Sequence, residues 1–284
     1  MAKARLGVLA VYLNGNKLEE ISYFRKLCLQ GKKDMESRSS FFTPDDEAPE
    51  EGTVNALYYN ALSCEWVRKR IRIPSLVYDR ARYQGAEMSA KVKDFRERNS
   101  HIDYLGKPLA NKWVMHGILS DCDKLTRHIP KTCKYSSGKD LSSFLPGHSL
   151  LILKPINGTG GRGVLKLHRL SKQEYIVQGR DPQRNMLHPR RMTERQITAQ
   201  LKAWGLSDKY VIQQGIPLTL SDGRVHDYRL LIQKDRSGKW DITGCAGRIG
   251  PKRSITSNLH GGGAAVPLET LLKRTFSSEE GSGR

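Results

Sequence analysis

Hydrophobic residues near the start of the chain alternate between strand-like and helix-like spacing. The continuous apolar run at residues 6–13 is typical of a buried strand. At residues 17–31 the apolar positions recur at helical spacing, and Gly31 is a natural helix end. Further short strands are predicted at residues 41–44, 53–62, 66–72 and 76–79. This alternation indicates a small α/β layer with a parallel sheet.

The middle of the chain contains several patterns of helical spacing. Residues 80–105 are highly charged and are predicted to form a helix with Val92 and Phe95 facing inward. Residues 126–134, which contain a proline, are predicted to form a loop or a short strand. Further helices are predicted at residues 111–119, 141–145 and 193–204, the last with the capping-box pair Thr193 and Gln196.

Strand patterns return around a glycine-rich segment and continue towards the end of the chain. Residues 149–154 and 163–170 form a predicted hairpin around that segment. Residues 171–209 are strongly basic. Further strands are predicted at residues 210–214, 224–234 and 240–249. The last eight residues, 277–284, have the composition of a flexible tail.

Charge narrows the classes of partner. The formal net charge of +19 favours an anionic partner such as a nucleotide, a nucleic acid, an acidic polymer or an anionic surface. Aromatic residues make up only 7% of the chain and do not accompany the basic clusters, so a dedicated nucleic-acid interface is not expected. We find no apolar run long enough for a membrane helix, and the first apolar run is too short for a signal peptide.

The five cysteines are scattered and odd in number, and none forms a C-x-x-C pair. That pattern predicts reduced thiols in a cytoplasmic protein and gives no reason to assign a metal site.

The segment from Asn157 to Gly163 carries the most specific chemistry. Four of the six residues 158–163 are glycine, which permits positive φ angles and leaves backbone N–H groups uncovered. Consecutive uncovered N–H groups form an anion-binding nest, and Arg162 adds a positive charge. The segment is neither a Walker loop nor a Rossmann fingerprint, because it joins two strands. A plain glycine-rich turn remains the alternative, although Lys154 just upstream could reach a nucleotide held under the loop.

These motifs, in this order, resemble the ATP-grasp family. That family carries one lysine at the start of a central-domain element and a second at the end of a strand before a glycine-rich loop. Lys112 and Lys154 stand at those positions, and residues 210–216 stand where the adenine hinge is expected. Residues 226–232 resemble its D-x-R strand, Gly247-Arg248 its phosphate-contacting arginine and residues 257–263 its N-L-x-x-G-G element. Residues 6–13 and 76–80 are more similar to YheC/YheD proteins, which are spore-coat-associated, than to other branches; the resemblance covers residues 5–272.

The resemblance implies a set of site residues. The residues expected to bind ATP are Lys112, Lys154, Asn157, Gly158, Gly160, Gly161, Arg162, Gly163, Gln213, Gln214, Gly215, Ile216 and Asn258. Arg229 and Arg248 are expected to stabilise the transferred group or to hold a substrate carboxylate. Structural alternatives remain open, since Arg229 could pair with Asp227 or Asp241, and Asp227 could simply hold either arginine. Relatives often carry an acidic residue near positions 213 and 214, so the two glutamines leave the ribose contacts open, and neither His226 nor His260 is assigned as a catalytic base.

One departure from the family concerns the metal. ATP-grasp enzymes end with an Asp and a Glu-x-Asn that bind Mg²⁺, and no Glu-x-Asn follows Gly263. The family therefore implies Mg²⁺ while its main ligands are not in this chain, and we assign no metal ligand. Either the chain is truncated or it has lost the metal site.

The expected fold class is α/β (α+β), an ATP-grasp fold preceded by an α/β pre-ATP-grasp domain. We expect domains at residues 1–105 and 106–276, the second truncated at its C-terminal end, followed by the tail at 277–284. The expected function is ATP binding by a protein descended from a ligase that joins a carboxylate to an amine or thiol through an acyl-phosphate. The alternatives are a non-catalytic spore-coat structural protein, with coat proteins as partners and a location at the coat, and a binder of anionic polymers.

Overall fold

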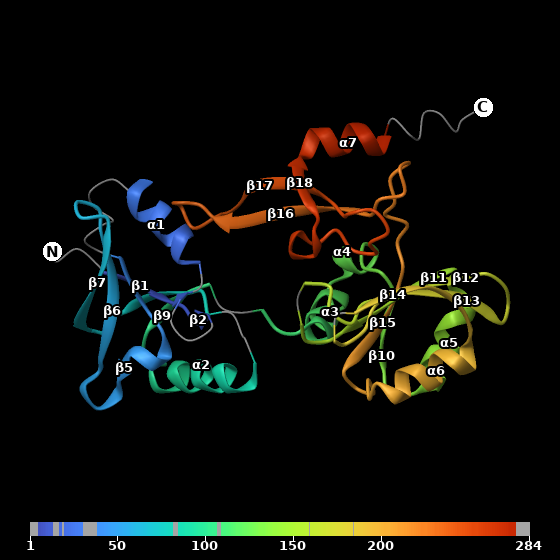
Figure 1. The fold of residues 1–284 in the computed structure, drawn as a ribbon, viewed down its shortest axis with the longest axis horizontal. Helices are drawn as coiled ribbons and strands as arrows, with labels where there is room; N and C mark the ends of the chain where they lie inside the picture. Colours follow the sequence, from blue (N-terminus) through green and yellow to red (C-terminus); the bar gives the residue numbers. More distant parts are fainter. Residues whose placement is uncertain are drawn as a thin grey trace. The chain divides into compact units, whose positions relative to one another are not determined.

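The protein forms two compact units, Met1–Leu109 and Ala110–Arg284 (Figure 1). The computed structural model describes residues 5–13, 17, 18, 20–30, 39–81, 85–106, 109–158, 160–183 and 185–276. None of the helices in these stretches is long and apolar enough to cross a membrane.

The first unit is built on a mixed seven-stranded sheet of order β5-β6-β4-β1-β8-β9, with β7 paired to β6. Its strands are β1 (Leu6–Leu9), β4 (Ser39–Phe42), β5 (Glu47–Ala48), β6 (Thr53–Asn60), β7 (Glu65–Arg72), β8 (Leu76–Asp79) and β9 (Asp103–Leu105). Strand β1 runs parallel to β4 and β8, as expected, whereas β5, β6 and β7 are joined by antiparallel pairings. The completely buried Leu9, Phe42 and Val77 lie in its core.

Tertiary pairing shifts three element boundaries in this unit. The run at residues 6–13 is broken into β1 and β2 (Tyr12–Leu13), and β2 pairs with β3 (Lys17–Leu18). Helix α1 therefore spans Ile21–Gln30 and begins later than predicted, while Gly31 lies outside the described residues. Helix α2 spans Ala86–Arg98, so the predicted helix at residues 80–105 is too long at both ends, and β9 pairs with β8 beyond its C-terminal end.

The second unit contains two antiparallel sheets. The six-stranded sheet has the order β10-β15-β11-β12-β13-β14, and the three-stranded sheet has the order β16-β17-β18. The strands are β10 (Thr132–Tyr135), β11 (Leu150–Pro155), β12 (Leu165–Arg169), β13 (Glu174–Arg180), β14 (Met186–Thr193), β15 (Tyr210–Gln214), β16 (His226–Lys234), β17 (Trp240–Ile249) and β18 (Ala264–Pro267). The helices are α3 (Lys112–Ser120), α4 (Asp123–Thr126), α5 (Gly138–Phe144), α6 (Glu194–Ala203) and α7 (Leu268–Phe276).

The two faces of the six-stranded sheet have different roles. Side chains alternate between faces along a strand, and in β11 the buried Leu151 and Leu153 belong to the main core of this unit. Helices α5 and α6 lie together on one side of the sheet (Figure 1), and both contribute to that core. Lys154 alternates with these leucines and therefore points to the other face, which forms one wall of a pocket.

The smaller sheet is covered by α7. Leu271 of α7 is completely buried with Ile249 at the end of β17. The predicted hairpin, the strand at 210–214, the two strands around the 235–238 turn and the capped helix at 193–204 are all confirmed. Strands β13, β14 and β18 and helix α7 are elements that the sequence patterns did not predict.

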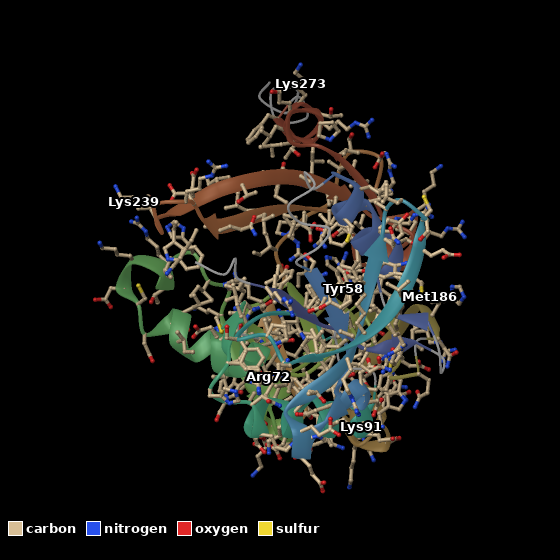
Figure 2. The ribbon with its side chains drawn as sticks, turned by 90° about the vertical axis from the view of Figure 1, so that its left-hand side faces the viewer. Tyr58, Arg72, Lys91, Met186, Lys239 and Lys273 are labelled. Atoms are coloured by element: carbon tan, nitrogen blue, oxygen red, sulfur yellow. The ribbon has the colours of Figure 1, made fainter. Side chains whose placement is uncertain are left out.

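Basic side chains extend from the surfaces of both units. Figure 2 labels three exposed examples, Arg72 at the end of β7, Lys239 at the turn between β16 and β17, and Lys273 on α7. The net positive charge is thus spread over many elements of both units.

Candidate functional site

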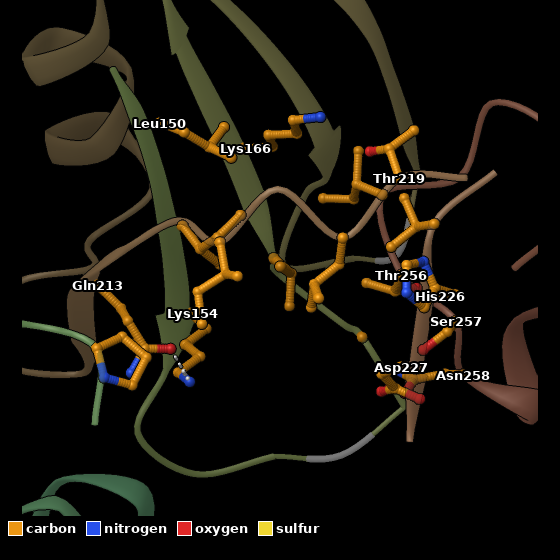
Figure 3. A pocket seen from close by; sticks show the side chains of 18 of the residues that line it. Leu150, Lys154, Lys166, Gln213, Thr219, His226, Asp227, Thr256, Ser257 and Asn258 are labelled. Atoms are coloured by element: carbon orange, nitrogen blue, oxygen red, sulfur yellow. Dashed lines mark hydrogen bonds between the residues drawn. The ribbon is translucent and has the colours of Figure 1, made fainter. Parts of the chain in front are cut away.

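A pocket of about 590 Å³ opens between the two sheets of the second unit. Strands β11, β12 and β15 form one wall, and β16 with residues 255–258 forms the other. The glycine-rich loop, residues 157–163, contributes Gly158, Gly160 and Gly161 to its lining. Figure 3 shows Lys154 and Gln213 across the pocket from His226, Asp227 and Asn258.

Lys154 lies at the end of β11, where the strand delivers it to the pocket face. Its Nζ donates a hydrogen bond to Gln213 Oε1 on the neighbouring strand β15, at 2.7 Å. Gln213 Nε2 in turn donates to Thr132 Oγ1 at 2.8 Å, which fixes the amide orientation. Gln213 therefore positions the lysine.

Lys112 approaches the pocket from the start of helix α3. Asn111 caps this helix, because its Oδ1 accepts hydrogen bonds from the backbone N–H of Trp113 at 3.1 Å and of Val114 at 3.0 Å. Lys112 Nζ donates to the carbonyl oxygen of Gly158 at 2.7 Å. A well-capped helix thus presents the lysine to the base of the glycine-rich loop.

The two lysines share one electrostatic environment. Burial lowers the pKa of Lys112 below its ordinary value. Burial lowers the pKa of Lys154 as well, and the positive charge of Lys112 lowers it further. Each ammonium donates to a neutral oxygen, so an anion placed between them would relieve their repulsion.

The glycine-rich loop reaches from one wall of the pocket to the other. Gly161 has φ of +78°, and a Cβ atom there would lie 3.0 Å from Asn258 Nδ2 and 3.2 Å from Thr256 Oγ1. Gly163 has φ of +65°, and a Cβ atom there would lie 2.1 Å from Tyr210 Oη. Glycine is therefore required at both positions for the backbone conformation and for the close approach.

The opposite wall is organised by an ion pair. Asp227 on β16 faces Arg248 on β17 in the sheet register, and Arg248 Nε donates to Asp227 Oδ1 at 2.6 Å while Nη2 donates to Oδ2. Burial alone would raise the pKa of Asp227, but hydrogen bonds from Arg248 and Ser257 hold it below its ordinary value. Asp227 therefore stays ionised and holds Arg248, whereas Arg229, two residues along the strand, is exposed and lines the pocket.

The structure brings most of the predicted site residues together. Those that line the pocket are Lys112, Lys154, Gly158, Gly160, Gly161, Arg162, Gln213, Gln214, Ile216, Arg229 and Asn258. The other four predicted residues are not part of the lining: Asn157, Gly163, Gly215 and Arg248. Gly163 faces Tyr210, Gly215 lies against Leu150, and Arg248 turns towards Asp227. The contacts of all fifteen with a ligand remain predictions.

Several lining residues were not predicted. Lys166 lies between the buried Leu165 and Leu167 on β12, so strand alternation could have identified it as a pocket residue. Thr256 and Ser257 lie in an irregular segment after β17 and reach the pocket through the packing of the two sheets. No periodic pattern in the sequence marks them.

The charge of the pocket is strongly unbalanced. Five cationic side chains line it, namely Lys112, Lys154, Arg162, Lys166 and Arg229. Among the described residues, Asp227 is the single carboxylate in the lining, and it is paired with Arg248. The same residues contain no group of three or more His, Cys, Asp or Glu that could hold a metal ion. A polyanion therefore fits the donors of this pocket. If a cation accompanies the polyanion, Asp227 is the carboxylate of the described lining that would bind it.

The two sheets, the lysine pair and the glycine-rich loop between them define the architecture of an ATP-grasp protein. A family model described as YheC/D-like ATP-grasp matches residues 101–283, and the chain belongs to this family. The α/β ATP-grasp fold expected from the sequence is therefore confirmed.

Two curated relatives come from Bacillus subtilis (strain 168). Endospore coat-associated protein YheC is 29% identical over 82% of this chain, and endospore coat-associated protein YheD is 27% identical over 77%. The matched region spans 64% of YheC and 48% of YheD.

Similar solved structures include D-alanyl-alanine synthetase A from Vibrio cholerae, with 15% identity, a TM-score of 0.49 and coverage of 89% of this chain and 70% of that one. Another is D-alanine–D-alanine ligase from Helicobacter pylori, with 15% identity, a TM-score of 0.42 and coverage of 97% and 84% respectively.

Proposed function

We propose that this chain binds ATP in the pocket beneath the glycine-rich loop. The observation that carries the proposal is the excess of five cationic side chains over one already paired carboxylate in a pocket of about 590 Å³. Backbone N–H groups of the loop add further donors for phosphate oxygens. ATP-grasp proteins bind ATP, typically with Mg²⁺, so the family supports the same ligand.

Within this proposal the two ends of the pocket have different tasks. Lys112 and Lys154 would neutralise phosphate charge beside the adenine end, where β15 would provide the hinge. The loop would close over the phosphates and exclude water, while Arg229 would face the group that is transferred or the substrate carboxylate. Arg248 would act through Asp227, since the ion pair turns it away from the lining. When bound, Mg²⁺ would neutralise phosphate charge.

We further propose descent from a ligase that activates a carboxylate as an acyl-phosphate and transfers it to an amine or thiol. The second unit would be the ATP-grasp domain, and the first unit would be the pre-ATP-grasp domain. Residues 277–284, the predicted tail, lie outside the described residues. A non-catalytic role at the spore coat is the second candidate, and it is favoured by the coat-associated names of both curated relatives.

Isothermal titration of the full chain with ATP, with and without Mg²⁺, tests the binding proposal. We expect saturable 1:1 binding in at least one condition, and no heat of binding up to millimolar ATP would contradict it. ADP release is then measured across a panel of amino acids and short peptides. Substrate-stimulated ADP release supports the ligase, whereas binding without turnover across the panel supports the coat role.

A further inference from the structure

His226 lines the pocket and carries a buried polar atom without a hydrogen-bond partner. The residue is only 5% exposed, and its Nδ1 is the single buried side-chain nitrogen or oxygen without a hydrogen-bond partner among the described residues. Its imidazole lines the pocket on the wall facing Lys154 (Figure 3). A buried polar atom left without a partner costs roughly 1–3 kcal/mol, so an orphan at a pocket wall points to a partner supplied by the ligand.

The surroundings of His226 hold the ring in place. Its backbone N–H donates to the carbonyl oxygen of Leu218 at 2.9 Å, which anchors the first residue of β16. The ring of Tyr228 meets the imidazole edge-on, with centroids 5.8 Å apart and an interplanar angle of 89°. The orphan nitrogen therefore belongs to a side chain that is packed by its neighbours.

The charge of the pocket identifies the partner atom. Cations dominate the lining, so the ligand group that enters is anionic. On the same wall Thr256 and Asn258 come close to Gly161 of the loop that would cover phosphates. An oxyanion that reaches Nδ1 accepts a hydrogen bond from it, which requires the proton to be on Nδ1.

We propose that His226 is a ligand-binding residue whose Nδ1 donates a hydrogen bond to a phosphoryl oxygen of the bound nucleotide. This contact rests on the proposed function, because it needs the nucleotide in the pocket. It adds a specific donor on the three-stranded wall, opposite Lys154 and Lys166 of the six-stranded wall.

Three substitutions separate this role from a packing role. His226→Asn keeps a polar donor at the position of Nδ1, His226→Gln moves it to the position of Nε2, and His226→Phe keeps the ring without a donor. Dissociation constants for AMP, ADP and ATP are measured by calorimetry on the full chain, and thermal melts are recorded without ligand. The thermal melts identify any variant that fails to fold. If the Phe variant does not fold, the comparison of the Gln and Asn variants provides the test.

We expect the Phe and Gln variants to weaken binding by about tenfold, the loss of one hydrogen bond to a charged group, and the Asn variant to stay within about threefold of the wild type. The first nucleotide in the series AMP, ADP, ATP that shows this difference identifies the phosphate that is contacted. The ligand-free Phe variant should melt at or above the wild-type temperature, since the orphan atom is gone.

Two outcomes overturn the inference, and they are distinguishable. If the wild type binds nucleotides and the Phe and Gln variants bind them equally well, the His226 contact is wrong while the proposed function stands. If the wild type binds none of the three nucleotides, both the proposed function and this contact fail.

Discussion

At the scale of single residues, the site depends on charges placed in an environment that disfavours them. Lys154 donates a hydrogen bond to Gln213, and the positive charge of Lys112 repels its ammonium group. Burial lowers the pKa of both lysines below the ordinary lysine value. On the other wall, Asp227 and Arg248 compensate each other. The cations of the lining outnumber its one carboxylate, which is already paired with Arg248, and this leaves an excess of positive charge in the pocket.

The lowered lysine pKa values predict the pH dependence of ATP binding. A bound polyanion favours the protonated ammonium, so affinity falls as pH rises through the pKa values of the free protein, which lie below the ordinary 10.5. Above the lowered pKa the loss should approach about tenfold per pH unit for each linked proton. Titrations between pH 7 and 10.5, with circular dichroism to confirm folding, measure this. Affinity that stays constant until pH 10.5 would show that these lysines do not contact the ligand.

The ion pair on the opposite wall predicts a stability effect. Arg248→Ala should lower the free energy of unfolding by about 1–3 kcal/mol at pH 7, because Asp227 loses its partner. Arg236→Ala, at the exposed turn between β16 and β17, is the matched control. Urea denaturation provides the measurement.

The sign of the pH effect follows from the pKa of Asp227, which is lower in the folded protein than its ordinary 3.8. The stabilisation by Arg248 is therefore present above that value and is lost as pH falls through the folded-state pKa. The gap between wild type and Arg248→Ala should narrow in acid. A gap that persists unchanged when the carboxylate is protonated would assign the effect to packing.

At the scale of elements, the sequence predicts those strands and helices that have a clear local pattern of their own. Strand β11 is a nearly continuous apolar run, β12 alternates buried leucines with polar residues, and α6 begins with a capping box, so all three were predictable. Strand β14 was not, because it lies at the edge of the sheet and most of its side chains are exposed. β9 was mistaken for helix since only its pairing with β8 distinguishes it.

The loop between β11 and β12 provides a matched pair of glycines for a test. Gly161 and Gly238 both have φ of +78°, but a Cβ atom would meet Asn258 and Thr256 at Gly161 and nothing within 4 Å at Gly238. Both Gly161→Ala and Gly238→Ala should lose roughly 1–2 kcal/mol of stability from backbone strain. Only Gly161→Ala should also weaken ATP binding, by about tenfold, which calorimetry measures. Equal ATP affinities in the two variants would show that the conformation of the loop at Gly161 does not affect ATP binding.

At the scale of the whole molecule, the pocket exists because two sheets with different local patterns pack in one unit. Motif order predicted that Lys112 and Lys154 would meet near the glycine-rich loop, and both line the pocket. The contribution of Thr256 could not be predicted, since it depends on how the three-stranded sheet faces the six-stranded one. The D-x-R strand placed His226 beside the site, but nothing in the sequence marked its buried, unpartnered nitrogen.

The net charge of +19 predicts how salt separates specific from general anion binding. Charge spread over the surface should bind mixed-sequence DNA weakly and lose most of that binding between 50 and 500 mM NaCl, by about two orders of magnitude or more. ATP binding should weaken by less than about tenfold, because Lys112 and Lys154 are partly shielded from solvent. Filter binding and calorimetry over that salt range give both values. Equal salt sensitivity would favour an anionic-polymer binder.

The most direct test of the account is the dissociation constant of ATP for the wild type, Lys154→Met and Lys239→Met. Lys154 meets the ligand in the proposed site, while Lys239 is an exposed lysine at the turn between β16 and β17 (Figure 2). The account predicts that Lys154→Met weakens ATP binding by about tenfold to a hundredfold and that Lys239→Met leaves it unchanged. Equal affinities in all three proteins would contradict an ATP site beneath the glycine-rich loop.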